Sequence, residues 1–276
     1  MTKQFVCAVD VGTGSARAGI LDTNGTLLGR AERPIAMNQP KPDHAEHDSR
    51  DIWSAVCAAV RAAREKAGIA AEEVVGISFD ATCSLVVRDR QGGQLSVSTT
   101  GDKRWDTIVW LDHRAIAEAD ECTASGHAVL NYVGGVMSPE MATPKLMWLK
   151  RNLPETWNEA GYLFDLTDFL TWQATGSLAR SQCTLTAKWT YLAHESRWDE
   201  TYFRKIGLGA LADEAFARIG TEIVPAGAAL GGGLTAQAAA DLGLNPGTAV
   251  AAGLIDAHAG GVGTVGARGD FGSVLS

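Results

Sequence analysis

The sequence predicts an α/β fold whose core runs strand, strand, strand, helix, strand and carries helical insertions. Three observations support this class. Short apolar runs separated by tight turns fill the first 37 residues, a helical repeat of apolar residues follows, and all eight tryptophans lie between Trp53 and Trp198, which suits a broad packed platform. Regular alternation of strands and helices, which would indicate a doubly wound nucleotide-binding sheet, is not the pattern here.

The first three strands are predicted by the turns between them. Residues 5–11 form a compact apolar run, and a glycine turn leads into a second run at 16–21. Asn24 and Gly25 then form a tight hairpin turn, because this pair favours positive φ. With residues 26–37 as the third strand, the segment is expected to form an antiparallel meander.

The first helix is predicted by its ends and by its apolar spacing. After a polar, proline-containing loop at 38–47, Asp48 stands as an N-cap, and apolar residues recur at helical spacing from 52 to 63. Gly68 is expected to end this helix. The apolar run at 74–79 then predicts the next buried strand.

The rest of the chain is predicted to be mostly helical. The expected elements are a hairpin over 85–88 and 94–97, helices over 113–125, 141–151, 167–175, 201–206 and 235–242, and a strand over 248–252. The order strand, strand, strand, helix, strand is the layout of the ribonuclease-H-like fold, which sugar kinases, actin and the heat-shock chaperone ATPases use.

Net charge limits the kinds of binding partner, and the cysteine spacing indicates the redox state of the thiols. The 24 basic and 32 acidic residues give a net charge of −8, which argues against nucleic acid or an anionic membrane as the main partner. The five cysteines, at 7, 57, 83, 122 and 183, show no C-x-x-C spacing and are expected to be reduced thiols of a cytoplasmic protein. We expect neither a signal peptide nor a membrane span.

The turn between the first two strands carries groups that suit a phosphate. Glycines let backbone N–H groups approach phosphate oxygens, hydroxyls add donors, an arginine pairs with the anion, and an aspartate can hold Mg²⁺ through waters. It is neither a Walker loop nor a Rossmann fingerprint, and an ordinary glycine-rich hairpin is the alternative. The candidate nucleotide-binding residues are Asp10, Gly12, Thr13, Gly14, Ser15 and Arg17, with Asp10 also the candidate metal ligand.

A second candidate lies near the end of the chain. Asp256 follows the predicted strand and stands where a helix rich in glycine and alanine begins. Phosphoryl transfer needs positioning, metal charge and one group that accepts the hydroxyl proton, and Asp256 fits that last role. A simple N-cap aspartate is the alternative, and His258 by itself is more typical of a packed or solvent-bonded histidine.

Together, Asp10-x-Gly12-Thr13-x-Ser15-x-Arg17 and the string at 253–261 resemble the FGGY carbohydrate kinases, and so does the glutamate-containing loop at 44–53. Segments 82–87 and 110–114 are most similar to pentulose kinases, the D-ribulokinase branch in particular. Glycerol kinases place Arg-Glu, and xylulokinases Met-His, where Thr82-Cys83 stand here.

The resemblance implies an activity and a set of site residues. It implies ATP- and Mg²⁺-dependent phosphorylation of a terminal hydroxyl of a pentulose or pentitol, with D-ribulose first and L-ribulose, ribitol and D-xylulose as alternatives. Asp256 aligns with the family's general base. For Asp112, a structural pair with Arg114 or Arg104 is an equal alternative to a sugar contact. The implied sugar-contacting residues are Thr82, Cys83, Asp112, His113 and Lys145, with Glu140 on weaker alignment.

The resemblance also implies two lobes with ATP between them. We expect residues 1–250 to be the N-terminal sugar-binding lobe and 251–276 to be the start of a truncated nucleotide-binding lobe, because Leu275 and Ser276 look like the middle of an apolar strand. On this view the chain lacks most of the ATP site. The alternatives are an isolated sugar-binding module without kinase activity and a chaperone-like or actin-like ATPase, and a homodimer is possible.

Overall fold

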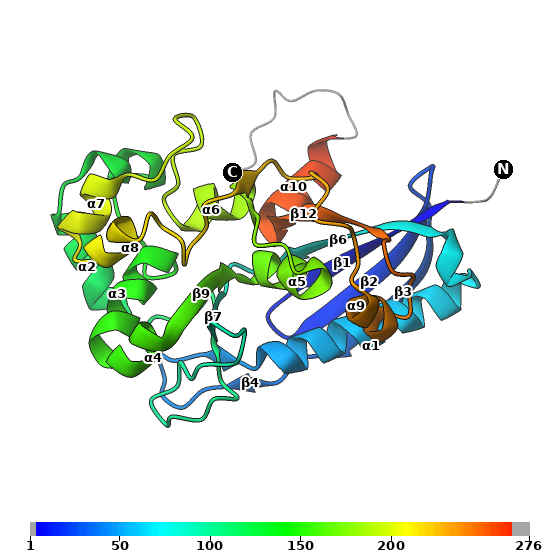
Figure 1. Ribbon diagram of the computed structural model, residues 1–276, viewed down its shortest axis with the longest axis horizontal. Helices are drawn as coiled ribbons and strands as arrows, with labels where there is room; N and C mark the ends of the chain where they lie inside the picture. Colours follow the sequence, from blue (N-terminus) through cyan, green and yellow to red (C-terminus); the bar gives the residue numbers. More distant parts are fainter. Residues whose placement is uncertain (1–3, 267–276) are drawn as a thin grey trace.

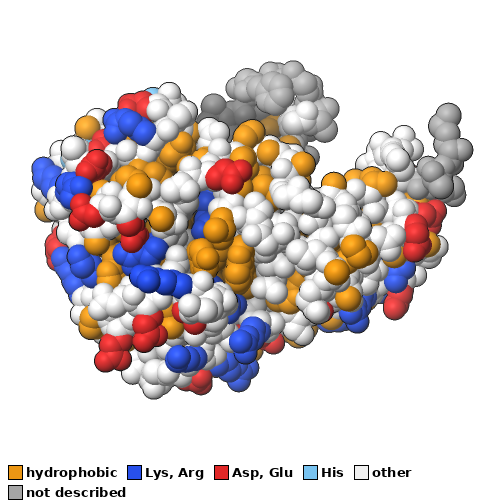
Figure 2. Space-filling model, viewed as in Figure 1, with side chains coloured by type: hydrophobic (Ala, Val, Ile, Leu, Met, Phe, Trp, Pro, Cys, Tyr) orange, Lys and Arg blue, Asp and Glu red, His pale blue; other side chains and the backbone are white. Residues whose placement is uncertain are grey.

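The computed structural model describes residues 4–266, which form two regions side by side (Figure 1). One region is a five-stranded sheet with a long helix beneath it. The other gathers several short helices around a second five-stranded sheet. Each region has its own cluster of buried apolar side chains. In Figure 2 charged side chains crowd the helical region, whereas the face over the first sheet is mainly uncharged.

The first sheet confirms the predicted fold class. Its strands lie in the order β12-β6-β1-β2-β3, with β1/β2 and β2/β3 antiparallel and β1/β6 and β6/β12 parallel. This is the meander followed by parallel crossover strands that the sequence predicts. The strands are β1 (Phe5–Val11), β2 (Ser15–Asp22), β3 (Leu27–Pro34), β6 (Val74–Ala81) and β12 (Ala249–Ile255).

The third strand is shorter than predicted. β3 ends at Pro34, and the short strand β4 (Met37–Asn38) belongs to the second sheet instead. Proline has no N–H to donate to a ladder, so it suits the end of an edge strand. The prediction of one continuous strand over 26–37 was therefore wrong at its C-terminal end.

Helix α1 (Ser49–Ala67) packs on the first sheet as predicted. The Asp48 carboxylate accepts a hydrogen bond from the Arg50 N–H at 2.9 Å, and Gly68 adopts the left-handed conformation at φ 67°. In β3, a Cβ on Gly29 would lie 2.3 Å from the Ala63 carbonyl oxygen. A side chain at position 29 would therefore force the helix away from the sheet.

The second region corrects the predicted hairpin. Its sheet has the order β4-β5-β8-β7-β9, and Gln94 makes only an isolated bridge to Arg88. Strand β7 pairs instead with β8 on one side and with β9 on the other. The remaining elements are β5 (Glu46–His47), β7 (Leu85–Asp89), β8 (Thr107–Ile108), β9 (Ala160–Asp165), α2 (Ile116–Ala124), α3 (Ala142–Asn152), α4 (Pro154–Glu159), α7 (Glu200–Lys205), α8 (Gly209–Asp213) and the 3₁₀ helices at Ala71–Glu73 and Ala128–Val133.

Hydrogen bonds from Thr167 and Ser181 hold the C-terminal end of β12 between the regions. The Thr167 hydroxyl donates to the Leu254 carbonyl at 3.0 Å, and the Ser181 hydroxyl donates to the Gly253 carbonyl at 2.7 Å. A Cβ on Gly253 would lie 2.1 Å from the Phe79 carbonyl, so only glycine fits there. The elements around this junction are α5 (Leu166–Thr175), β10 (Arg180–Ser181), α6 (Gln182–Lys188), β11 (Ile223–Val224), α9 (Ala236–Leu242) and α10 (Asp256–Val265).

The predicted lobe boundary at residue 250 falls inside β12, which pairs with β6 in the first sheet. Residues up to the end of β12 therefore belong with the first lobe, and a nucleotide-binding lobe beyond it stays a prediction. The strand-like character expected of Leu275 and Ser276 concerns residues outside the described range. All five cysteines are free thiols, and none of the helices in residues 4–266 is both long and apolar enough to cross a bilayer.

Candidate active site

Three carboxylates meet at one edge of the first sheet. Asp10 near the end of β1 is the register partner of Asp80 near the end of β6, and Leu254 of β12 pairs with Asp80 on its other side. Asp256 follows two residues later as the first residue of α10. Because these strands are parallel, their carboxyl ends bring the three side chains to the same edge.

Asp80 is the member of this group that the sequence analysis missed. Burial, followed by the negative charges of Asp10 and Asp256, raises the pKa of Asp80 to about 7. The predicted strand at 74–79 stopped one residue before it. A polar residue directly after a buried strand was a usable signal, but its meaning depended on the pairing of β6 with β1, which spacing does not give.

The predicted phosphate loop is a tight turn between β1 and β2. The Gly12 N–H donates to the Ser15 carbonyl at 3.0 Å, and the Ile35 N–H donates to the Gly14 carbonyl at 3.0 Å. Gly14 is exposed, and nothing lies within 4 Å of where its Cβ would be. The Thr13 hydroxyl accepts a hydrogen bond from the Trp110 indole N–H at 2.8 Å. The loop tip is thus well ordered and open on its outer side.

Two predicted phosphate ligands are held by other side chains. The Ser15 hydroxyl is 7% exposed and donates to the Glu32 carboxylate at 2.7 Å. Arg17 pairs with Asp10 at 2.8 Å and with Glu32 at 3.4 Å, and the hydrogen bond to Asp10 raises the Arg17 pKa. Arg17 therefore neutralises part of the carboxylate edge, and Ser15 supports the turn from below.

The residues expected to touch the sugar begin directly beside this loop. The Thr82 N–H donates to the Val11 carbonyl at 3.0 Å, which places the 82–84 segment against the start of the phosphate loop. The Thr82 and Ser84 hydroxyl oxygens lie 3.4 Å apart. Cys83 is half-buried, and this burial raises the pKa of its thiol. Thr82 and Cys83 are thus placed close to the carboxylate edge.

Lys145 and Asp112 are enclosed rather than open to a ligand. Lys145 is 1% exposed, and its ammonium group donates to the carbonyls of Val109 and Trp110 at 2.8 and 2.9 Å. Desolvation lowers the Lys145 pKa to about 7. Asp112 makes a two-point pair with Arg114 at 2.8 and 2.7 Å, the structural alternative that the sequence left open. Two of the three Lys145 ammonium hydrogens and both Asp112 carboxylate oxygens thus have partners within the protein.

His113 and Glu140 lie at the surface of the second region. The His113 ring nitrogen Nε2 is 3.4 Å from the Glu140 carboxylate, and the two side chains are 48% and 30% exposed. Lys188 at the end of α6 was not singled out from the sequence. Burial raises the pKa values of Cys83 and Asp165, and the positive charge of Lys188 partly offsets that rise in both groups, so this charge reaches the 82–84 segment.

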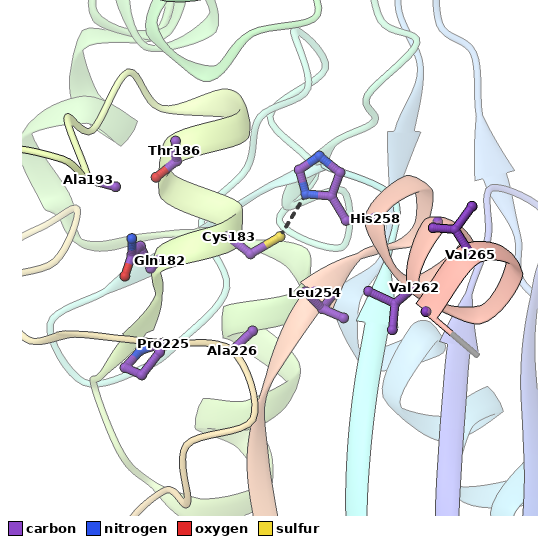
Figure 3. Close-up of a pocket in the computed structure, with 12 residues that line it drawn as sticks. Gln182, Cys183, Thr186, Ala193, Pro225, Ala226, Leu254, His258, Val262 and Val265 are labelled. Atoms are coloured by element: carbon purple, nitrogen blue, oxygen red, sulfur yellow. Dashed lines mark hydrogen bonds between the residues drawn. The ribbon is translucent and has the colours of Figure 1, made fainter. Parts of the chain in front are cut away.

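A separate apolar groove of about 670 Å³ runs between α6 and α10 (Figure 3). Cys183 and His258 face each other across it, with the thiol sulfur 3.1 Å from the ring nitrogen Nδ1. Desolvation raises the pKa of the Cys183 thiol. None of the residues expected to contact the sugar lines this groove. The pair links α6 to α10 two residues after Asp256.

The residues at the sheet edge fit a nucleotide phosphate and its metal ion. Arg17 pairs with Asp10 there, and residues 4–266 hold no group of three or more His, Cys, Asp or Glu side chains that could chelate a metal ion directly, so Asp10 and Asp80 suit a Mg²⁺ ion that keeps its waters. The open Gly14 tip leaves room for a phosphate beside them. Residues 5–263 match the sequence profile of the FGGY family of carbohydrate kinases, N-terminal domain. The chain belongs to this family.

Two relatives show how similar this FGGY chain is to known proteins and how much of them it covers. An FGGY carbohydrate kinase domain-containing protein of Danio rerio is 52% identical over 268 residues, covering 97% of this chain and 49% of that protein. A D-ribulokinase of Saccharomyces cerevisiae is 41% identical over 280 residues, covering 96% of this chain and 39% of that protein. The chain thus spans about half the length of the curated relatives it matches.

Solved structures agree on the fold of this FGGY chain. A xylulose kinase from Rhodospirillum rubrum superposes with a TM-score of 0.80 at 22% identity, covering 94% of this chain and 50% of that one. A gluconate kinase from Lactobacillus acidophilus gives 0.78 at 19% identity, covering 93% and 49%. At such identities the likeness concerns the fold. The family resemblance and the fold class predicted from the sequence are both confirmed.

Proposed function

We propose that this chain is the sugar-binding half of a kinase that transfers the terminal phosphoryl group of ATP to a terminal hydroxyl of a pentulose or pentitol. The observation that carries the proposal is the convergence of Asp10, Asp80 and Asp256 at one sheet edge, beside the phosphate loop and the Thr82 segment. The 41% identity to a D-ribulokinase supports D-ribulose as the first substrate to test.

Asp256 is proposed to accept the proton of the sugar hydroxyl. It is the first residue of α10, so its side chain is held at the N-terminal end of that helix. One carboxylate oxygen accepts the Ala257 N–H at 2.8 Å, which leaves the other oxygen for the hydroxyl. A base fixed in this way orients the hydroxyl for in-line attack as well as removing its proton.

Asp10 is proposed to hold Mg²⁺ through water, with Asp80 beside it. When bound, the metal ion would neutralise charge on the β- and γ-phosphates. Arg17 holds the Asp10 carboxylate through a hydrogen bond of 2.8 Å. Burial, followed by the charges of Asp10 and Asp256, raises the pKa of Asp80, and its protonated form limits repulsion within the group. The loop residues Gly12, Thr13 and Gly14 are proposed to approach the phosphates.

Sugar recognition is proposed to involve Thr82, Cys83 and Lys188. A hydroxyl, a thiol and a flexible ammonium group can bond successive sugar hydroxyls. A site built to hydrogen-bond a hydroxyl rejects analogues that lack it, because its own groups are then left unpaired. Lys145 and Asp112 are left out of this set, since both are committed to internal partners. His113 and Glu140 are proposed to lie at the rim.

The nucleotide half of the site is proposed to lie in the part of the family that this chain does not span. We also propose a cytoplasmic protein that can form a homodimer. Two measurements test the function: phosphorylation of D-ribulose, L-ribulose, ribitol and D-xylulose by the gene product that contains this chain, and calorimetry of the same sugars. We expect turnover with ATP and tightest use of D-ribulose. Sugar binding without any sugar phosphate would instead favour a binding module. The absence of both binding and sugar phosphate would reject the proposal.

A further inference from the structure

Trp110 lies between the sugar-contact segment and the phosphate loop and is bound by both. Its backbone N–H donates to the Ser84 hydroxyl at 3.2 Å, next to Thr82 and Cys83. Its indole N–H donates to the Thr13 hydroxyl at 2.8 Å, across 97 positions of sequence. One residue therefore connects the two segments on which the proposed function depends.

The main chain of Trp110 is held firmly in place. The buried ammonium group of Lys145 donates to the Trp110 carbonyl at 2.9 Å and to the Val109 carbonyl at 2.8 Å. Strand β8, which ends at Ile108, pairs with β5 and β7 just before this point. Because the backbone is fixed on the sugar side, the ring presents its N–H to the phosphate loop from a rigid support.

The chemistry of the two groups gives this contact a direction. An indole nitrogen can only donate, so the Thr13 oxygen must accept. The hydrogen of the Thr13 hydroxyl then points elsewhere, and in residues 4–266 the Thr13 side chain has no second partner. The turn around it is already closed by the Gly12 and Ile35 backbone hydrogen bonds. The hydroxyl is left as an oriented donor at the open tip of the loop.

We propose that Trp110 is a positioning residue, whose indole N–H orients the Thr13 hydroxyl toward a nucleotide phosphate and couples that loop to the sugar-contact segment. The inference rests on the proposed kinase function. Trp110→Phe removes the N–H and keeps an aromatic ring. Thr13→Val removes the hydroxyl and keeps the branched shape, whereas Thr13→Ser keeps the acceptor and serves as the matched control.

Kinetics of the gene product that contains this chain test the coupling. A net hydrogen bond of about 1 kcal/mol corresponds to roughly a fivefold change, so Trp110→Phe should lower kcat/KM for ATP by that factor. KM for the sugar should stay within about twofold. Thr13→Val should lose more, Thr13→Ser should restore most of that loss, and Trp110→Phe should add less than about twofold in the Thr13→Val background.

A readout independent of turnover tests the hydrogen bond itself. Trp110→Phe identifies the Trp110 indole N–H signal in a ¹H–¹⁵N spectrum by removing it. Thr13→Val should shift that signal, while the Trp198 indole, which donates to the Gly220 carbonyl at 3.0 Å, should stay in place. An unmoved Trp110 signal in Thr13→Val would overturn the proposal even if both variants lose activity through misfolding.

The outcomes separate this inference from the function beneath it. If the wild-type kinase is active and Trp110→Phe leaves kcat/KM for ATP unchanged, the inference alone is overturned. The same holds if Trp110→Phe lowers kcat/KM by the same factor in the wild type and in the Thr13→Val background. A folded wild-type protein that phosphorylates none of the four sugars overturns the proposed function and the inference with it.

Discussion

The two regions of the molecule place their charges differently. In the sheet region the core is apolar, and the ionisable groups of Asp10, Asp80 and Asp256 are confined to one edge. In the helical region, charged groups lie deep inside: the side chains of Glu46, Asp112 and Arg114 form a network that is fully shielded from solvent. Charge in the first region is therefore available to a ligand, and charge in the second holds loops together.

The difference has a physical cause. Regular strands and a long helix satisfy their own backbone groups, so the first core needs no polar filler. The second region is assembled from short elements and long connections, whose backbone groups need partners. Arg114 donates to the Val97 carbonyl at 2.7 Å, and Asp112 accepts the Ala45 N–H at 2.5 Å. Buried ions are tolerable there because each is paired and hydrogen-bonded.

The largest effect is expected from Asp256→Asn at the sheet edge. The variant keeps the size of the side chain and loses the proton acceptor, so kcat should fall by about 10²–10⁴-fold with little change in sugar affinity. Steady-state kinetics of the gene product and calorimetry with the sugar measure the two quantities. Near-normal turnover would remove Asp256 from the role of base.

Asp112→Ala should affect stability rather than chemistry. It leaves Arg114 buried with Glu46 as its remaining carboxylate partner, and breaking a buried pair typically costs about 3–5 kcal/mol. Glu121→Ala is the matched control, because its pair with Arg151 is about half-exposed and should be worth less than about 1 kcal/mol. Denaturant unfolding measures both. Equal losses would contradict the division between the two regions.

Asp80→Asn should make stability less dependent on pH. The folded state raises the Asp80 pKa from 3.8 to about 7, so it binds a proton more tightly than the unfolded state. Wild-type stability should therefore fall as pH rises from about 4 to 7 and level off above. Asparagine removes this loss, and after allowing for solvent screening we expect Tm to rise by roughly 2–4 °C at pH 8.

The comparison for Asp80→Asn is a melting curve at pH 5. The gain in Tm should be clearly smaller there, because the wild-type carboxyl is still largely protonated in the folded state. A gain of the same size at both pH values would show that the charge of Asp80 is not the cause.

The fold of the sheet region could be predicted because its signals are local. The Asn24-Gly25 turn, the Asp48 cap and the Gly68 ending each act within a few residues. Asp10 and Asp256 followed from motifs of the same kind. The predicted end of the third strand failed at Pro34, where the chain leaves one sheet for the other.

What the sequence could not supply was long-range pairing. Asp80 joins the site only because β6 pairs with β1 in a particular register. Lys145 has an ammonium group that could donate to a sugar, but the packing of α3 places that group against the carbonyls of Val109 and Trp110. The 94–97 segment gives way to β8 and β9 as partners of β7. Each of these outcomes depends on residues far apart in the chain.

The smallest effect is expected from Thr235→Ala, at the N-terminus of helix α9. The Thr235 hydroxyl accepts the Ala238 N–H at 3.1 Å as the N-cap of α9. Loss of such a cap costs about 1 kcal/mol, and no change in kcat is expected because the helix lies away from the carboxylate edge. Thermal unfolding and kinetics measure this, and a change in kcat would show that α9 communicates with the site.

The most direct test of the account is the identity of the product that the gene product forms from ATP and D-ribulose, determined by ³¹P and ¹³C NMR. Asp256 at the carboxylate edge predicts a phosphate ester on the terminal hydroxyl, with one ADP formed per ester. A phosphate on a secondary hydroxyl, or no ester from any of the four sugars with folded protein, would contradict the account.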